Sequence, residues 1–422
     1  MTTPPAYSPI PSIPVPQFPP HPHPRVWLLT SATSPLGIAL ARLLLAHGDS
    51  VVVGMRASEV ENGVQRGEEF RRFWDEVCGV EVGNDGGQGE GKRVMDAPME
   101  LGENARERLR VVELDGRTMG KCQAAVAEAA EAFGRVDILF CCTSEAVIGT
   151  VEELAASPST LTLVRDQFET NYFGPVNIIK AVLPGMRERK SGHIIALTGI
   201  TGHLGTPGLS MYCAAGWALE GFCDSLAYEV APFNIKITIV QPNLEIGVLI
   251  NRITSAPLLP QYAPDVNPAP LSRTIIGGLL DRIDASQSHR QSYSSSPPST
   301  LNSNTPDGTP ETNPATTTTA ASPTPNLSSS TAITSLYPSL PTAMKDRLIA
   351  ETVHALTAIG GHENPPARHI VGCEGVASVK EKLKTVSEEL EDFVECSCAV
   401  DIEESVGEGG RAEQGDGVGV GG

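Results

Sequence analysis

The chain has 422 residues, 40% of them hydrophobic, and carries 31 basic against 50 acidic residues for a net charge of −19. Nucleic acids and anionic membranes would repel so acidic a protein, so we expect neither as a partner. The simplest expectation for the charge is a solvated acidic surface.

Nine cysteines are scattered along the chain, and none of their spacings matches a zinc-binding pattern. We expect reduced cysteines, no metal site and an intracellular protein. Cys396 and Cys398 form a C-x-C pair, for which a metal-binding or redox role is the less favoured alternative. The first residues lack the apolar stretch of a secretory signal, and no window has the roughly 18–20 apolar residues of a membrane helix. The expected location is the cytoplasm.

Residues 1–24 are rich in proline, which predicts an extended or disordered tail. Docking of this tail in an SH3- or WW-type groove is the less favoured alternative.

Strand and helix patterns alternate after this tail. Seven near-continuous apolar runs have strand character: 25–30, 50–55, 110–115, 135–142, 192–199, 234–243 and 367–372. Helical patterns occur at 35–48, 119–133, 161–188, 208–231 and 376–394. Ser34 is a natural N-cap for the first helix, Pro35 suits its first position, and Gly48 closes it. This order predicts an α/β fold, a single domain with a doubly wound, parallel, seven-stranded sheet.

Several segments interrupt the alternation. Residues 57–109 form an insertion whose first half has a helical pattern and whose second half is loop-like. Residues 285–340 are rich in Ser, Thr and Pro, which predicts a disordered insertion, either a spacer or a phosphorylated segment. This insertion divides the domain into two parts, residues 25–284 and residues 341–398. The first part is predicted to end in a lid at 244–284. The acidic, glycine-rich end, 399–422, is predicted to be disordered.

Two long motifs suggest a family. They are ETNYFGPVNIIKAVLP in mid-chain and GTPGLSMYCAAGWALEGFCDSLAYEV after the HIIALTG strand. With the first strand–turn–helix, they resemble the short-chain dehydrogenase/reductase family, in particular its 17β-hydroxysteroid-dehydrogenase-like branch. The resemblance extends over residues 25–398 and implies a Rossmann-type fold, a bound NAD(H) or NADP(H), and hydride transfer to or from a small apolar carbonyl or alcohol. It also implies a homo-oligomer formed through helices 161–188 and 208–231.

The family's phosphate-binding turn reads T-G-x-x-x-G-x-G, and TSATSPLG stands in its place. The resemblance makes Thr30, Ser34 and Gly37 cofactor-binding candidates, whereas Ser31 and Pro35 replace two glycines. Pro35 removes an N–H donor from the helix end that would face the pyrophosphate, so we expect weakened binding. Close packing of helix on strand is the alternative explanation for Gly37.

Three later positions also match cofactor-binding residues. Arg56 ends the second strand, where a basic residue in the family contacts the 2′-phosphate of NADP; a solvated arginine is the alternative. Asp115 matches a residue near the adenine ring, or else caps the turn after its strand. Pro242 begins PNLEIG, which replaces the family's P-G-x-x-x-T. The resemblance thus favours NADP(H) over NAD(H), and the lost glycines leave open that neither binds.

The fourth strand normally ends in N-N-A-G, and here it ends in Cys141, Cys142, Thr143 and Ser144. We expect the two cysteines to be packing residues rather than a redox pair.

The catalytic positions are only partly filled. Tyr212 matches the family's acid/base tyrosine and Asn171 the asparagine of its proton relay, although Asn171 has plain backbone hydrogen bonding as an alternative. The lysine expected one helical turn after the tyrosine is Gly216, and the expected serine is Gly199. Two threonines are candidate substitutes for that serine: Thr198 and Thr201. A tyrosine without help has a pKa of about 10, so roughly one molecule in a thousand is phenolate at pH 7.

Three hypotheses follow. The favoured one is a catalytically degenerate homologue, a pseudoenzyme with a binding or regulatory role. The second is a divergent NADP(H)-dependent oxidoreductase with Tyr212 as acid/base. The third is an interaction protein that acts through its disordered segments.

Overall fold

The computed structural model describes residues 17–31, 33–57, 65–79, 101, 104–242, 252–263, 266 and 342–398. The predicted insertion 285–340, the tail 399–422 and most of the predicted lid lie outside these ranges. The chain divides into two compact units, Met1–Val379 and Lys380–Gly422.

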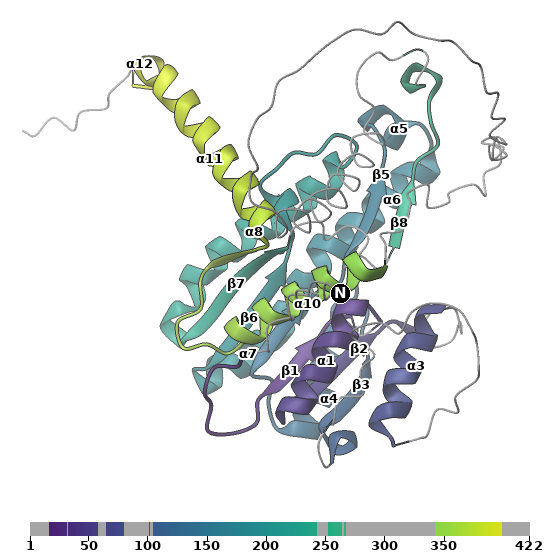
Figure 1. The fold of residues 1–422 in the computed structure, drawn as a ribbon, viewed down its shortest axis with the longest axis vertical. Helices are drawn as coiled ribbons and strands as arrows, with labels where there is room; N and C mark the ends of the chain where they lie inside the picture. The colour runs from purple at the N-terminus through teal and green to yellow at the C-terminus, as the bar shows by residue number, and fades with distance from the viewer. Residues whose placement is uncertain are drawn as a thin grey trace, which may run out of the picture. The chain divides into compact units, whose positions relative to one another are not determined.

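A parallel seven-stranded sheet organises the larger unit (Figure 1). Its strands are β1 (Val26–Leu29), β2 (Ser50–Met55), β3 (Leu109–Glu113), β4 (Ile138–Cys141), β6 (Gly192–Leu197), β7 (Ile235–Pro242) and β9 (Arg368–Val371). They lie in the order β3-β2-β1-β4-β6-β7-β9. This is the predicted Rossmann-type sheet. Its order reverses between β1 and β4, where the carboxyl ends of parallel strands leave a crevice.

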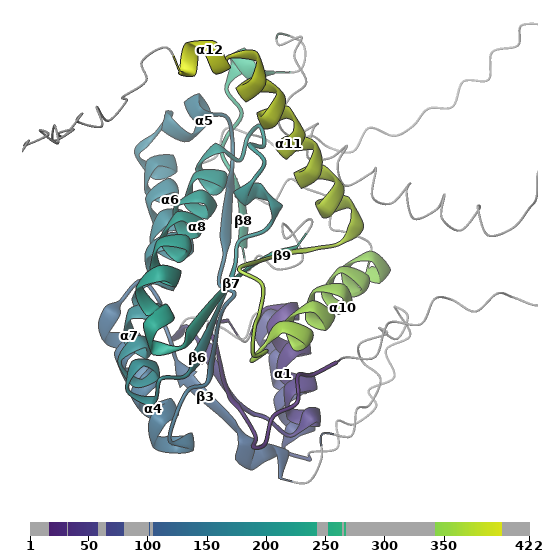
Figure 2. The same ribbon diagram turned by 90° about the vertical axis from the view of Figure 1, so that its left-hand side faces the viewer.

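Helices cover both faces of the sheet (Figure 2). One face carries α1 (Pro35–His47), α3 (Gln65–Val77) and α10 (Thr342–Ile359), and the other α4 (Met119–Phe133), α7 (Gly174–Arg189) and α8 (Ser210–Val230). Alternate strand residues feed the two cores, because side chains along a strand point to opposite faces. Thus Trp27 and Leu29 lie in the core under α1, and Val26 and Leu28 lie in the core under α4.

The ends of α1 follow the sequence prediction. Ser34 is the N-cap, and its hydroxyl accepts a hydrogen bond from the Gly37 N–H at 3.0 Å. Pro35 occupies the first helical position, and Gly48 closes the helix with a φ of 102°. Local signals alone therefore fix both ends of the helix that starts at the crevice.

The helix predicted over 161–188 is not continuous. It consists of α6 (Pro158–Phe168), a π-helical turn η3 (Glu169–Phe173) and α7. Pro175 has no N–H to offer the Asn171 carbonyl, and the Gly174 N–H bonds back five residues to Glu169. Apolar periodicity does not reveal such a wide turn, and this one contains a predicted catalytic residue.

The structure contains elements that the sequence did not suggest. A second, two-stranded sheet joins β5 (Glu145–Ile148) to β8 (Arg252–Ser255). Short helices are α5 (Val151–Ala155), η2 (Ala105–Arg108), η4 (Ile200–Gly202), η5 (Ala231–Phe233) and η6 (Pro260–Tyr262). The C-terminal helices are α11 (Cys373–Asp392), which runs into the smaller unit, and α12 (Val394–Ser397).

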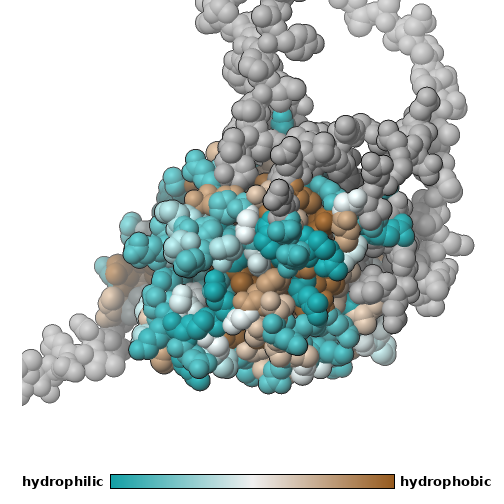
Figure 3. All heavy atoms as spheres, turned by 90° about the horizontal axis from the view of Figure 1, so that it is seen from below, coloured by the Kyte–Doolittle hydropathy of each residue, from teal (hydrophilic) through white to brown (hydrophobic). Residues whose placement is uncertain are grey.

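Apolar side chains are concentrated in the two cores. On the face seen from below, hydrophobic residues appear as small patches between hydrophilic ones (Figure 3). Among the described helices, none combines the length and apolar character needed to cross a membrane.

Candidate functional site

A cleft opens at the carboxyl ends of β1 to β4. Its empty volume, including the open mouth, is about 440 Å³. Its lining includes Thr30, Ser31, Arg56, Arg117, Thr143 and Thr170. This is the crevice at the strand-order reversal, where doubly wound sheets bind their ligands.

Two arginines line the cleft, and each is paired with a carboxylate. The Arg56 guanidinium lies 2.7 Å from Glu145 Oε1 and 3.4 Å from the Thr170 hydroxyl. Arg117 donates to Asp115 Oδ2 at 2.6 Å, and its hydrogen bonds lower the pKa of the Asp115 carboxyl. The cleft therefore holds two cations that a negatively charged ligand could reach by displacing a carboxylate.

Asp115 also performs the structural task that the sequence left open. Its Oδ1 accepts the Arg117 backbone N–H at 3.1 Å, which caps the turn after β3. The loop it caps comes very near α7, since a Cβ on Gly116 would lie 3.0 Å from the Cα of Gly174. Sequence reasoning did not single out Arg117, because its position in a turn resembles that of any solvated arginine.

The turn after β1 is compact and internally bonded. The Thr30 hydroxyl accepts the Cys142 N–H at 3.0 Å, and Thr143 donates to the Thr30 carbonyl at 3.1 Å. A Cβ on Gly37 would collide with the Ser31 carbonyl, so this glycine is needed for close packing. That agrees with the structural alternative for Gly37.

These contacts decide how well the turn suits a pyrophosphate. Pro35 has no N–H, and the Gly37 N–H is already donated to Ser34. Two of the donors that a helix N-terminus normally offers an anion are thus missing or used. The cleft fits the nucleoside end of a dinucleotide, beside Arg56 and Arg117, better than the pyrophosphate.

Cys141 and Cys142 are buried beside this turn. Burial raises the pKa of the Cys142 thiol to about 11, and it raises the pKa of Cys141 well above its usual value. Both are therefore neutral packing groups at neutral pH, because the thiolate is the reactive form.

Tyr212, on α8, is 5% exposed. Its hydroxyl lies 3.3 Å from the hydroxyl of Ser144, which follows β4. Sequence reasoning missed Ser144, because it sits where the family has a glycine. The only available signal was a hydroxyl side chain in the loop that replaces N-N-A-G.

Asn171 and Ser144 are joined through Glu145. Asn171 accepts the Glu145 N–H and donates to the Glu145 carbonyl, both at 2.8 Å. The Glu145 side chain pairs with Arg56. Glu145 thus connects the cleft with the neighbourhood of Tyr212, and Asn171 bonds to the backbone of β5 rather than to that of its own helix.

The two glycines at the family's catalytic positions differ. Gly199 has φ 78° and ψ 170°, a conformation that only glycine adopts readily. Gly216 has room, because a Cβ there would come no nearer than 4.0 Å to Gly202. Serine at position 199 would strain the backbone, whereas a side chain at position 216 would not.

The threonines proposed as substitutes for serine are engaged elsewhere. Thr198 donates to Glu220 at 2.8 Å, and the Thr201 hydroxyl lies 3.5 Å from the Thr198 carbonyl. Pro242 ends β7 and is paired with Val371 of β9. Asn243 and Gly247 lie outside the described residues.

Residues 88–245 match the family model of short chain dehydrogenases. Oxidoreductase BOA17 of Botryotinia fuckeliana is 31% identical over 218 residues, which cover 52% of this chain and 65% of that relative. Human retinol dehydrogenase 8 is 35% identical over 144 residues, 33% of this chain and 43% of the relative. These matches span less than two thirds of either relative.

A solved short-chain dehydrogenase from Streptomyces avermitilis has the same fold. It superposes with a TM-score of 0.54 at 22% identity, covering 90% of this chain and all of that one. Sequence motifs, strand order and relatives agree, and the chain belongs to the short-chain dehydrogenase/reductase family.

Proposed function

We propose that this protein is a catalytically degenerate member of its family that binds a nicotinamide nucleotide and has a binding or regulatory role. The observation that carries the proposal is the surroundings of Tyr212. One turn along α8, Gly216 offers no ammonium group, and Gly199 offers no hydroxyl in a conformation that disfavours serine. Neither position therefore supplies the ammonium group or the hydroxyl that the family's acid–base chemistry uses.

The nucleotide proposed is NADP(H). The 2′-phosphate on the ribose of NADP(H) suits a cleft that contains two guanidinium groups, whereas NAD(H) lacks this phosphate. Arg56 and Arg117 would hold this end and Thr30 would border it. A nicotinamide nucleotide supplies hydride-transfer chemistry when bound. The capped turn at Pro35 predicts weak binding.

A fluorescence titration tests this proposal. NADPH should bind the purified protein more tightly than NADH, and Arg56→Ala should weaken NADPH binding about tenfold or more, since a charge-assisted hydrogen bond is worth about 1.5–3 kcal/mol. Arg110→Ala is the matched control, because Arg110 is exposed and pairs with Glu128 away from the cleft lining. No NADPH binding at millimolar concentration, or equal loss in both variants, would contradict the nucleotide assignment.

A second candidate, a divergent oxidoreductase acting on an apolar carbonyl or alcohol, rests on the hydroxyl pair. Ser144 places an Oγ 3.3 Å from the Tyr212 hydroxyl, so it could hold a substrate oxygen in place of the missing serine. Its test is NADPH oxidation with a panel of apolar carbonyls. Turnover that Tyr212→Phe abolishes and Ser144→Ala lowers about 100-fold would establish this candidate and overturn the degenerate assignment.

A further inference from the structure

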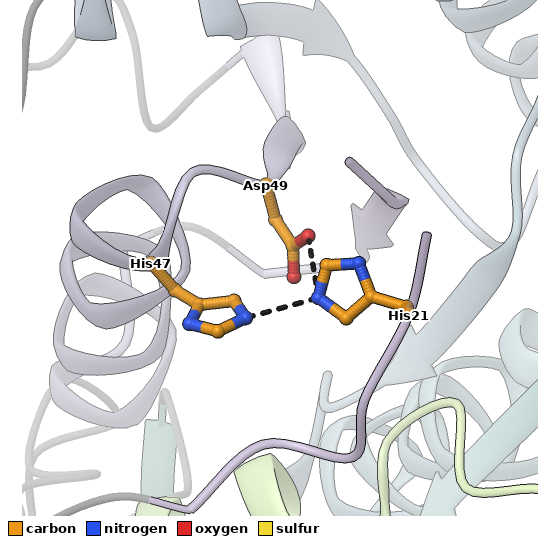
Figure 4. Close-up of side chains that lie close together, drawn as sticks. All are labelled: His21, His47 and Asp49. Atoms are coloured by element: carbon orange, nitrogen blue, oxygen red, sulfur yellow. Dashed lines mark hydrogen bonds and ion pairs between the residues drawn. The ribbon is translucent and has the colours of Figure 1, made fainter. Parts of the chain in front are cut away.

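A cluster of polar side chains lies at the C-terminal end of α1, away from the cleft at its N-terminal end. His21 comes from the segment before β1, His47 from the last turn of α1, and Asp49 from the turn just before β2 (Figure 4). Their nearest donor atoms all lie within 4.8 Å of one another. The imidazole Nε2 atoms of His21 and His47 are 2.9 Å apart, and His21 Nε2 is 3.7 Å from Asp49 Oδ1.

The other polar atoms of His21 and Asp49 are held as those of metal ligands usually are. His21 Nδ1 lies 2.7 Å from the His23 carbonyl, which can only accept, so Nδ1 carries the hydrogen and Nε2 presents its lone pair. The Asp49 Oδ2 accepts from the Arg25 guanidinium at 2.9 Å and from the Trp27 indole at 3.1 Å. Outer hydrogen bonds of this kind orient a ligating histidine and carboxylate.

The spacing suits one small cation. Two imidazole nitrogens 2.9 Å apart, each about 2.05 Å from an ion, subtend an angle of about 90° at it. The pair from His21 Nε2 to Asp49 Oδ1 subtends about 130° in the same way. A distorted tetrahedron with one open position accommodates both angles.

The electrostatic surroundings favour a cation in spite of Arg25. Arg25 engages Oδ2 with its side chain, and Oδ1 faces the histidines while also accepting the Arg25 backbone N–H. The C-terminal end of α1 adds its partial negative charge at His47. Asp49 is fully buried, so the site has a carboxylate in a fixed position. His47 is exposed, so an ion can reach the site from solvent.

We propose that His21, His47 and Asp49 form a binding site for a divalent transition-metal ion of the zinc type. The two imidazoles select such ions over Mg²⁺ or Ca²⁺, which prefer oxygen ligands, and a carboxylate is a common companion ligand of zinc. The ion would replace the hydrogen between the two Nε2 atoms. It would join the segment before β1 to α1, where Phe18 already stacks on the His47 ring at 3.7 Å.

Zinc titration of the full-length, tag-free protein tests the site. Cys396 and Cys398 are exposed thiols, so the parent protein should carry Cys396→Ser and Cys398→Ser. Isothermal titration calorimetry should give one zinc per chain, and His21→Ala and His47→Ala should each weaken binding at least about tenfold. His23→Ala is the matched control, because His21 uses only the backbone carbonyl of His23.

A second measurement separates binding from folding. Zinc should raise the melting temperature of the parent and of His23→Ala, but not of His21→Ala, whose circular dichroism should match the parent. A parent that binds no zinc, or whose binding persists in both His21→Ala and His47→Ala, would overturn the proposal. The first result would leave a metal-free hydrogen bond between the two rings.

Discussion

Gly216 and Gly199 stand at the two positions that the family uses for catalysis, yet they differ in what the backbone demands. The backbone at Gly199 has a positive φ that excludes most side chains. Gly216 lies in the middle of an ordinary helix with space around it. Only the first glycine has a conformational reason that the structure shows.

This difference predicts the effect of adding a methyl group. Gly216→Ala should stabilise the protein by about 0.5–1 kcal/mol, because glycine costs that much inside a helix. Gly221→Ala on the same helix is the control, since a Cβ there meets nothing within 4 Å. Urea unfolding measures both. If Gly216→Ala alone destabilises the protein, the glycine serves a purpose that the fold does not show.

Gly199→Ser should act in the opposite direction. A non-glycine residue in this conformation costs about 1–3 kcal/mol, and urea unfolding should show a loss of that size. Replacing both glycines by the family's residues, Gly216→Lys with Gly199→Ser, would therefore test latent activity poorly, because the serine would also strain the backbone. Gly216→Lys alone, with Ser144 retained, restores the ammonium without straining the backbone. Unchanged stability in Gly199→Ser would show that the loop relaxes.

His193 gives a pH prediction. Its imidazole is buried, and burial lowers the pKa of this group from its ordinary 6.5 to about 3. The unfolded chain therefore binds a proton below pH 6.5 that the folded chain refuses, so this histidine's contribution is complete above pH 6.5 and is lost as the pH falls. The free energy of unfolding should drop by about 2 kcal/mol from this group between pH 7.5 and 5. His193→Gln should flatten that part of the urea-measured profile, and an identical slope in both proteins would refute the assignment.

The sequence predicted several residues of the candidate site, but not the residues that they contact. Tyr212, Asn171 and Arg56 follow from motif positions, and the structure connects Asn171 with Arg56 through Glu145. Ser144 could not be found, because its contact with Tyr212 joins residues 68 apart in sequence. The φ of Gly199 was also hidden, since a glycine at a strand end is compatible with many turns.

At the scale of elements, helix ends that depend on capping residues close by in the sequence were predicted well. The caps of α1 and the bounds of α4 match, because Ser34, Gly48 and Gly134 act on their own neighbours. The π-helical turn and α10 were missed for the opposite reason. The first depends on Pro175 within an apolar helix, and the second on packing against α1 from far along the chain.

We propose that the homo-oligomer expected from the family forms through the exposed face of α8. Trp217 is 53% exposed and Tyr228 is 85% exposed, three turns apart on one helix face. Light scattering should show a dimer or larger, and Trp217→Glu with Tyr228→Glu should shift it to monomer. Val151→Ser, an exposed apolar position on α5, should leave the mass unchanged. A monomeric parent protein would contradict the expectation.

At the scale of the whole molecule, the fold class followed from the order of apolar strands and helices. The order of strands within the sheet was not predicted, since hydrophobic patterns do not show which strands pair. The segments at 57–109 and 285–340 obscured the pattern only locally, because the strands on either side kept their character.

The first strand and the last third of the chain complete one core together. The Arg25 guanidinium donates to the Gly360 carbonyl at 2.7 Å across 335 residues of sequence, and a Cβ on Gly360 would collide with the Trp27 ring. A ribosome adding about 5–20 residues per second needs roughly 20–70 s to cover that separation. Throughout that time the apolar face of β1 and α1 lacks the helix that covers it. We therefore expect this part of the core to form only after α10 has been synthesised.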